Sequence, residues 1–520
     1  MLKLSLASLE WALNQALNYG DTDIFPPAFE FAAIKAEWVT LGTWLASQDI
    51  SQWNVRPGFR CLTPKHRYGY RLATQLDPLD FLVYTALVHE NGLAMEEARV
   101  PRSSQIVHSY RFDPQPDGVM YDSSCNYQSF SNRSEELASK NTEWVVLADI
   151  ADFYPRIYHH RLENALSAST SNNIVAKAID RMLNGWNASS SYGIPVGPAA
   201  STLLAEVALA DVDDALLSEG TRYVRFNDDF RLFCSDRREA YQRLAFLARV
   251  LFENHGLTLQ QHKTRIMTVA DFAEGYLKSP GFKELTSLTD KLRTILGELG
   301  LTDPYGTIDL DRLSEAQRSK IAELNLQGIL REQASKDEID VVLTRFVLRR
   351  LAQIRAVDSV DVVLDNIVNL YPVVPDIARY LRSLSNLEPA KKKDAGGKLL
   401  DLLLDSIVSH LEFHRMWLLS IFTHDRGFNH KDKFAAVAAN WADGPTQREA
   451  ILALGRSHQD SWFRTRKTEV GNLPPWSRRA FLYAASCLPA DELHHWYRQL
   501  RAQLDPLELA ITKWAENNRI

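Results

Sequence analysis

Two segments of this sequence place carboxylates beside apolar runs, an arrangement that suits chemistry at a phosphate. In the first, WVVLADIADFYPRIY at 144–158, an apolar run ends at Asp149. In the second, YVRFNDDFRLFC at 223–234, two apolar runs flank Asp228 and Asp229. Nucleotidyl transfer from a nucleoside triphosphate uses two divalent cations about 3.5–4 Å apart, held mainly by oxygen ligands. We therefore predict that these three aspartates bind two Mg²⁺ ions, for which Mn²⁺ could substitute.

Each segment also has a structural explanation when it is taken alone. A single aspartate after an apolar run often caps a helix, and Asn-Asp-Asp is an ordinary composition for a tight turn. The two segments together are more specific. A carboxylate at the end of one strand that faces a hairpin carrying two more would form a single clamp for metal ions.

A glycine-rich segment and a lysine lie on either side of the second carboxylate segment. GIPVGPAASTLL at 193–204 places Gly197 and Ser201 where the backbone could approach a nucleotide or a base pair closely. Lys263, in LTLQQHKTRI at 257–266, could protonate the leaving pyrophosphate as a general acid. The structural alternatives are a helix-start turn with a small packing face and a solvated lysine.

A basic segment nearer the N-terminus is a candidate for binding the triphosphate. In TPKHRYGYRL at 63–72, Lys65, Arg67 and Arg71 flank a turn at Gly69. Basic side chains on such a hairpin can clamp a triphosphate. A charged hairpin surface is the structural alternative, and it would be preferred if this segment stood alone.

The elements that must position these residues change character along the chain. The first half mixes β-rich apolar runs with helices and turns, whereas serial helical patterns with short breaks follow from about residue 287. Serial helices favour antiparallel pairs in a solenoid-like stack, although no clear sequence repeat is present. We predict an α+β domain over residues 1–285 and an all-α, HEAT-like domain over residues 286–520, with turn residues 279–281 near the boundary.

Three patterns in the second half predict particular features. The pattern over 398–422 indicates one helix, and the run Lys-Lys-Lys-Asp-Ala-Gly-Gly at 391–397 is interpreted as a solvated loop. Over 462–483, aromatic residues interleave with basic ones, which could hold single-stranded DNA by stacking and phosphate contact. Helix packing with exposed arginines is the favoured explanation of that last pattern.

Composition and charge restrict the classes of protein and partner. The chain has 520 residues, enough for two or more domains, and a net charge of −6 with a pI near 6.2 counts against a long basic surface for duplexes. A short nucleic-acid channel remains compatible. The four cysteines lie far apart, as in a reducing cytosol. Residues 1–17 indicate an amphipathic helix rather than a signal peptide, and the stretch 399–422 is too polar to span a membrane.

The order and spacing of the first-half segments resemble the reverse-transcriptase family over roughly residues 25–285. Residues 149–154 look like its motif A, residues 194–197 with Ser201 like motif B, residues 226–229 like motif C, and residues 259–264 like motif D. The resemblance implies a right-hand polymerase palm and fingers, followed here by the helical half instead of a recognisable thumb. No single motif would be sufficient, but several agree in order.

The resemblance also implies roles for individual residues. It adds Ile150 to the metal ligands, and it places Lys65 and Arg71 in the fingers, where the triphosphate binds. Tyr154 lies at the position whose bulky ring would clash with a ribose 2′-hydroxyl. Deoxynucleoside triphosphates are therefore the expected substrates.

Within that family, the sequence is most similar to bacterial abortive-infection and other defence-associated reverse transcriptases. The similarity rests on segments 23–31, 108–112, 153–155 and 193–206 and on the helical second half. It implies a cytoplasmic DNA polymerase that acts in antiphage defence, often as a homo-oligomer. In some members synthesis needs no template and starts from a protein hydroxyl, so the single-stranded DNA product stays covalently attached.

Two departures from the family pattern favour synthesis without a template. Val196 replaces the glutamine common in motif B, and Phe226 replaces the usual tyrosine of motif C. One alternative is a conventional RNA-templated reverse transcriptase that uses a cellular or associated non-coding RNA. Another is a non-catalytic nucleic-acid-binding scaffold. The three intact aspartates count against the scaffold, because a cluster of like charges costs stability unless a metal uses it.

Overall fold

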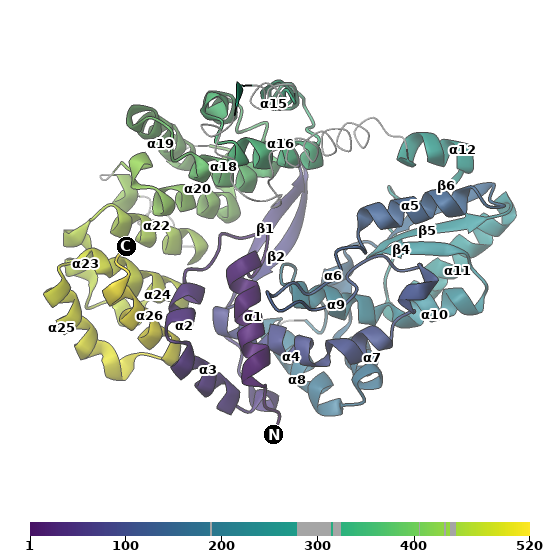
Figure 1. Cartoon of the computed structure of the whole chain (residues 1–520), viewed down its shortest axis with the longest axis horizontal. Coiled ribbons are helices and arrows are strands. Elements are labelled where there is room, and N and C mark those ends of the chain that lie inside the picture. The colour runs from purple at the N-terminus through teal and green to yellow at the C-terminus, as the bar shows by residue number, and fades with distance from the viewer. Residues whose placement is uncertain (188–189, 278–313, 316–323, 405, 431–432, 437–443) are drawn as a thin grey trace. The chain divides into compact units, whose positions relative to one another are not determined.

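The computed structural model describes residues 1–187, 190–277, 314–315, 324–404, 406–430, 433–436 and 444–520. These residues form two compact units (Figure 1). The first unit consists of Met1–Asp23, Pro27–Arg60 and Ala73–Ser279, and the second of Ile24–Pro26, Cys61–Leu72 and Pro280–Ile520. The predicted domain boundary between residues 285 and 286 lies outside the described residues.

A four-stranded antiparallel sheet is the centre of the first unit. Its strands are β3 (Trp144–Asp149), β4 (Tyr223–Phe226), β5 (Asp229–Cys234) and β6 (Arg265–Thr268), in the order β4-β5-β3-β6. The interior of β3, Val-Val-Leu-Ala, is buried along its whole length. A run of β-branched and aliphatic residues without alternation is typical of a strand that is covered on both faces.

Helices cover the two faces of this sheet. On one face, Val145 and Leu147 pack with Phe233 and with Phe130 of α5 (Tyr127–Ala138). Side chains alternate along a strand, so the neighbouring buried residues of β3 point the other way. Helix α11 (Arg237–His255) packs on β3 and β5 and accounts for that second face. The sheet is therefore a rigid platform for the residues at its strand ends.

A buried helix, α4 (Pro78–Glu97), contacts three further helices of the first unit, α1, α7 and α9, and other helices lie outside this group. The further helices described in this unit are α1 (Leu6–Tyr19), α2 (Glu30–Ala36), α3 (Trp38–Ser47), α6 (Phe153–Arg156), α7 (His159–Thr170), α8 (Asn173–Trp186), α9 (Ala199–Ala208), α10 (Ala210–Ser218) and α12 (Val269–Phe272). Helix α4 is apolar on almost every side, as expected for a helix enclosed by others.

The strands β1 (Phe59–His66) and β2 (Gly69–Gln75) form a hairpin whose residues 61–72 belong to the second unit, and the other regular elements described in that unit are helices. Arg67 of the hairpin donates a hydrogen bond to the carbonyl of Asp337, and the hydroxyls of Tyr70 and Tyr371 lie 3.2 Å apart. These contacts tie residues 61–72 to the helices of the second unit, although the sequence had suggested that they belong to the first domain.

Alternate helices of the second unit pack against one another in succession: α16 on α18, α18 on α20, α20 on α22, α22 on α24, and α24 on α26 (Figure 1). The helices are α15 (Leu326–Ala334), α16 (Val341–Gln353), α17 (Val360–Asp365), α18 (Val374–Ser383), α19 (Pro389–Leu404), α20 (Glu412–His424), α22 (Gly444–Arg456), α23 (Asp460–Arg466), α24 (Pro475–Ala484), α25 (Ala490–Leu500) and α26 (Pro506–Asn517). None of the described helices is both long and apolar enough to cross a membrane.

Two local predictions for this unit were wrong. The Lys-rich run 391–397 is not a loop but part of α19, and the stretch 398–422 is divided between α19 and α20 instead of forming one helix. A Cβ at Gly396 would lie 1.9 Å from the carbonyl oxygen of Phe428. The glycine that suggested a loop therefore serves a close helix contact.

Candidate active site

The three predicted aspartates meet at one end of the palm sheet. Asp149 is the last residue of β3 and pairs directly with Asp229, the first residue of β5. Asp228 lies in the tight turn that joins β4 to β5, and its carbonyl accepts a hydrogen bond from the backbone N–H of Ile150 at 3.1 Å. Strand register, rather than proximity in sequence, brings these residues together.

The turn before Asp228 is held by a buried arginine and a serine. Asn227 has a left-handed backbone with φ of 55°, a conformation that asparagine tolerates better than most residues. Its carbonyl accepts a hydrogen bond from Arg225 Nη1 at 2.9 Å, and its N–H donates one to Ser109 Oγ at 2.8 Å. Both backbone groups of this strained residue are therefore satisfied by fixed side chains.

That arginine belongs to a charged network with almost no solvent exposure. Arg225 pairs with Glu206 of α9 at 2.9 Å and with Asp213 of α10 at 2.5 Å. Glu206 also accepts hydrogen bonds from Arg99 at 2.8 Å and from Ser109 at 2.6 Å. Because each buried charge has an opposite partner, the network is stable only as a complete set. It links two helices to the turn that carries Asp228.

Sequence reasoning did not find this network, although one signal for it was present. Arg225 interrupts the apolar run YVRF, and Glu206 ends the apolar run LLAE. A charged residue within an apolar run is expected either to face solvent or to have a buried partner. The sequence alone does not show which of these two outcomes applies.

The electrostatics of the aspartates are compatible with a cation site. Burial raises the pKa of the Asp229 carboxyl to about 6, and the charges of Asp149 and Asp228 add to the rise while Arg231 and Lys263 oppose it. Such crowding of like charge is relieved when a divalent cation binds between carboxylates. The oxygen-rich donor set, to which Ile150 could add its main-chain carbonyl, also suits Mg²⁺.

The carboxylates are not arranged as a finished set of ligands. Among the described residues, no three His, Cys, Asp or Glu side chains form a group in metal-binding geometry. Asp149 is instead paired with a cation of the protein, because its Oδ1 lies 2.8 Å from the ammonium of Lys263. A cation would therefore have to draw Asp149 away from this lysine.

Lys263 is held next to the aspartates by backbone pairing. Gln260 donates its N–H to the carbonyl of Asp149 at 2.7 Å, and Lys263 donates its own N–H to the carbonyl of Gln260 at 3.1 Å. Burial disfavours the charged amine, but the hydrogen bond to Asp149 and the charges of the three aspartates outweigh it, so the pKa of Lys263 is raised. The side chain is thus a protonated donor at neutral pH.

Tyr154, the predicted sugar gate, lies in α6 within electrostatic reach of the aspartates. The ring is half-buried, and burial together with Tyr110, Glu206 and Asp228 raises its pKa well above the ordinary value. Its backbone carbonyl accepts a hydrogen bond from Ile194 at 3.0 Å. This position is consistent with a ring beside the substrate sugar.

Phe226, which replaces the usual tyrosine of motif C, packs among aromatic rings. The ring centroids of Tyr127, Tyr110 and Phe130 lie 5.6, 6.0 and 6.0 Å from it. A phenylalanine suits this cluster because it has no hydroxyl that needs a partner. The departure from the family pattern therefore leaves the three predicted metal ligands unchanged in type.

Two residues of the glycine-rich segment 193–204 contact other parts of the chain closely. A Cβ at Gly197, where φ is 143°, would lie 2.9 Å from both the Thr22 hydroxyl and the Thr74 carbonyl. Ser201 is completely buried, and its hydroxyl lies 3.0 Å from the Tyr84 hydroxyl. Gly197 thus lies close to the backbone and side chains of the protein, and the Ser201 hydroxyl has an internal partner; binding of substrate by these two residues stays a prediction.

The predicted triphosphate ligands lie on the hairpin of the second unit. Lys65 is exposed at the end of β1, and Arg71 lies on β2 with its Nε 3.4 Å from the Thr63 hydroxyl. They do not belong to the palm sheet that carries the aspartates. Their role as triphosphate ligands stays a prediction.

Comparisons with known proteins agree with the palm geometry. Residues 94–315 match the family model of the reverse transcriptase (RNA-dependent DNA polymerase), a range that contains all three aspartates, Tyr154 and Lys263. No curated protein sequence matches the chain.

Similar solved structures include two telomerases. Telomerase from Candida albicans in complex with a TWJ fragment of telomeric RNA is 11% identical, covers 78% of this chain and 70% of its own, and has a TM-score of 0.33. Apo telomerase from Candida tropicalis is 10% identical, covers 81% of this chain and 73% of its own, and has a TM-score of 0.32. Likenesses of this size establish neither a shared activity nor a shared partner. The family match is the firmer result: the chain contains a reverse transcriptase domain and is a nucleotidyltransferase of the RNA-directed DNA polymerase type.

Proposed function

We propose that this chain is a DNA polymerase that acts in antiphage defence and extends DNA without a template from a hydroxyl of the protein itself. The observation that carries the polymerase assignment is the pairing of Asp149 with Asp229 across the palm sheet, with Asp228 in the adjoining turn. The defence role rests on the resemblance of the chain to abortive-infection reverse transcriptases.

The three aspartates and the main-chain carbonyl of Ile150 would hold two Mg²⁺ ions. When bound, these ions supply a lower pKa for the attacking hydroxyl and charge stabilisation for the leaving pyrophosphate. Lys263 holds a proton beside this position and can donate it to the pyrophosphate. Outside the palm, Lys65 and Arg71 bind the triphosphate.

Tyr154 restricts the substrates to deoxynucleotides. Its half-buried ring lies on α6, directly after the strand that ends at Asp149. A bulky side chain there leaves no space for a 2′-hydroxyl. The ring therefore acts by steric exclusion, independently of its hydroxyl.

Synthesis without a template is supported by the segment around Val196. Valine offers no side-chain amide to a templated base pair, whereas the family's usual glutamine does. The Val196 carbonyl is bonded to the N–H of Thr74 at 2.9 Å, and Gly197 is closed against Thr22 and Thr74. These contacts fix the segment through its backbone, and the partly exposed Val196 side chain has no amide to offer to a base pair.

The helical unit takes the place of a thumb in this proposal. Its succession of alternately packed helices from α16 to α26 supports a HEAT-like stack. The resemblance adds a homo-oligomer as the functional state. A bound RNA belongs to the alternative function, a conventional reverse transcriptase.

The test is to incubate purified, nuclease-treated protein with labelled deoxynucleotides and Mg²⁺, without template or primer, and to analyse the product on a denaturing gel. Label that stays on the protein and grows into a ladder supports the proposal. A parallel reaction with EDTA should remain blank.

Two other outcomes would replace the proposal. Product that forms only on a primed RNA would identify a conventional reverse transcriptase. Absence of product with or without a primed RNA would contradict polymerase activity altogether. Equal incorporation of ribonucleotides would contradict the assignment of Tyr154 while leaving the polymerase assignment intact.

A further inference from the structure

The aromatic and basic residues of the segment 462–483 fall into two groups, and the first is explained by packing. The buried ring of Trp476 has the guanidinium groups of Arg448 and Arg479 at 5.3 and 4.7 Å. The ring of Tyr483 lies 4.7 Å from that of Trp514. These residues take part in helix packing within the helical unit, which is the explanation that the sequence favoured for this segment.

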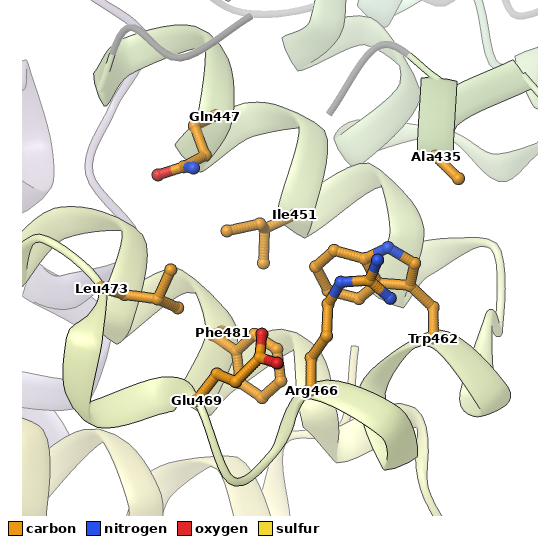
Figure 2. Close-up of a pocket in the computed structure, with 8 residues that line it drawn as sticks. All are labelled: Ala435, Gln447, Ile451, Trp462, Arg466, Glu469, Leu473 and Phe481. Atoms are coloured by element: carbon orange, nitrogen blue, oxygen red, sulfur yellow. The ribbon is translucent and has the colours of Figure 1, made fainter. Parts of the chain in front are cut away.

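The second group lines a cavity. Trp462 is half-buried on α23, and the exposed Arg466 lies with its guanidinium 4.7 Å from the centre of the Trp462 ring. Both residues line a hollow of about 230 Å³ between α22, α23 and α24. Figure 2 shows Arg466 lying across the Trp462 ring at one side of this hollow.

The apolar part of the lining is largely buried. Ile451 and Phe481 are only 2% and 1% exposed, and Leu473 adds a further aliphatic surface. The centroids of Phe481 and Trp462 are 5.8 Å apart. The half-buried ring of Trp462 is the aromatic surface on which a planar ligand can pack, and Phe481 and Ile451 close the bottom of the cavity behind it.

The polar part of the lining carries three different kinds of group. Arg466 supplies a cation, Glu469 a carboxylate and Gln447 an amide. Figure 2 shows the Glu469 carboxylate turned towards Ile451, that is, towards the apolar surface. A purely hydrocarbon ligand would bury these polar groups without giving them a hydrogen-bond partner, which costs free energy. The lining instead suits a flat molecule with polar groups on its edge.

The size of the cavity narrows the class of ligand further. Its volume lies below the range of about 300–1,000 Å³ that is usual for sites of drug-sized molecules. A single heterocyclic base packs on aromatic rings through its faces, offers an amino group to a carboxylate, and forms paired hydrogen bonds with a glutamine amide. Arginine would then meet the phosphate of the same nucleotide.

We propose that this cavity binds a nucleobase with an exocyclic amino group, such as adenine or cytosine, which stacks on Trp462 in place of the Arg466 guanidinium and places its amino group on Glu469. Two sources share this chemistry, a free nucleotide and a base of single-stranded DNA. The site is separate from the palm aspartates, and its existence does not depend on how the polymerase is primed.

The test uses the full chain with EDTA, so that binding of a metal–triphosphate complex at the palm does not contribute. Quenching of tryptophan fluorescence is titrated with dAMP, with dTMP, and with a short single-stranded oligodeoxyadenylate followed also by anisotropy. We expect saturable binding of dAMP or of the oligonucleotide and weaker binding of dTMP, whose base has no exocyclic amino group.

Variants locate the binding. Trp462→Ala should weaken affinity about tenfold or more, as measured by anisotropy. Arg466→Ala should weaken it through loss of the phosphate contact. The matched control is Arg464→Ala on the same helix, because Arg464 is paired with Glu492 at 3.0 Å and does not line the cavity. Glu469→Gln, at an exposed position, should reduce the preference for dAMP over dTMP without affecting folding.

Binding of dAMP itself assigns the site to free nucleotides, and binding of the oligonucleotide alone assigns it to single-stranded DNA. Either result supports the proposal if the Trp462 and Arg466 variants lose it and the Arg464 variant keeps it. No binding by the unaltered chain, or equal binding by Arg466→Ala and Arg464→Ala, would overturn it. Normal DNA synthesis by the same preparation would show that such a failure concerns this cavity alone.

Discussion

The ammonium of Lys263 lies 2.8 Å from Oδ1 of Asp149, so it competes with any cation that binds through this oxygen. The lysine side chain is 64% exposed and the aspartate side chain 17%, so the pair lies at the edge of the protein rather than within it. An exposed pair of this kind is weak and can open. Lys263 can therefore hold Asp149 in place before a cation binds and release it afterwards.

Lys263→Met should have opposite effects on metal affinity and on turnover. Removal of the competing ammonium should tighten Mn²⁺ binding about two- to fivefold, in proportion to the small energy of an exposed ion pair. Loss of the proton donor should lower kcat. Mn²⁺ affinity is measured by electron paramagnetic resonance without nucleotide, and Lys140→Met is the control at another exposed, paired lysine. An unchanged Mn²⁺ affinity would argue against competition at Asp149.

The turn that carries Asp228 should depend on Ser109, which lies far from it in sequence. Ser109 Oγ accepts the N–H of Asn227 at 2.8 Å and donates to Glu206 at 2.6 Å. Ser109→Ala leaves that N–H without its acceptor, which should lower kcat with little change in the KM for nucleotide, because the catalytic carboxylate is misplaced while the triphosphate ligands are intact.

Steady-state kinetics with Ser104→Ala as the control would check this assignment. The Ser104 hydroxyl donates only to the nearby Pro101 carbonyl and has no contact with the turn. A variant of Ser109 with a raised KM and an unchanged kcat would contradict a positioning role.

The strands that carry the aspartates could be predicted because their patterns are local. An unbroken apolar run predicts β3, and two runs around Asn-Asp-Asp predict the β4–β5 hairpin. The network behind the hairpin could not be predicted in this way. Glu206 and Arg225 lie on different elements, and only the packing of α9 against the sheet region decides that each is the other's partner.

The helical half shows a second limit of local patterns. The apolar residues of 398–422 continue through the break between α19 and α20, so periodicity alone does not reveal it. In the segment that separates the two helices, the carbonyls of Ser409 and His410 accept hydrogen bonds from Arg415 of α20 at 2.6 and 3.2 Å. A contact from a later turn of the chain thus fixes a helix boundary that the run itself leaves open.

Tyr154→Ala should raise the use of ribonucleotides relative to deoxynucleotides. The expected reason is steric, because the ring removed is the one next to the sugar. The measurement is competition between a ribo- and a deoxynucleotide in the incorporation reaction. Tyr158→Ala is a suitable control, since the ring of Tyr158 stacks on Tyr192 at 4.9 Å and has no proposed contact with substrate. Equal ratios for the parent chain and Tyr154→Ala would count against a sugar gate.

The stability of the helical unit should fall in acid because of His414. Burial lowers the pKa of this imidazole to about 4, whereas an unfolded histidine titrates near 6.5. Between these values the unfolded chain binds a proton that the folded chain does not, so stability is lost as the pH falls from about 6.5 towards 4. The loss should approach roughly 2 kcal/mol at about pH 5.

Urea unfolding at about pH 7.5 and pH 5 measures this effect. His414→Phe keeps a ring next to Tyr371, whose centroid is 4.4 Å away, and should make unfolding less sensitive to acid than in the parent chain. His410→Phe, at an exposed position, should leave the sensitivity unchanged. The same acid sensitivity in all three proteins would exclude His414 as its source.

The most direct test of the central claim is incorporation of labelled deoxynucleotide by a variant with Asp228→Asn and Asp229→Asn. Asparagine keeps the shape of both side chains in the turn but removes the charges that a metal ion requires. Asp214→Asn, at an exposed aspartate of α10 outside the four motifs, is the matched control. We expect no incorporation by the double variant, normal incorporation by the control and the same circular dichroism for both. Undiminished incorporation by the folded double variant would contradict the assignment of the active site.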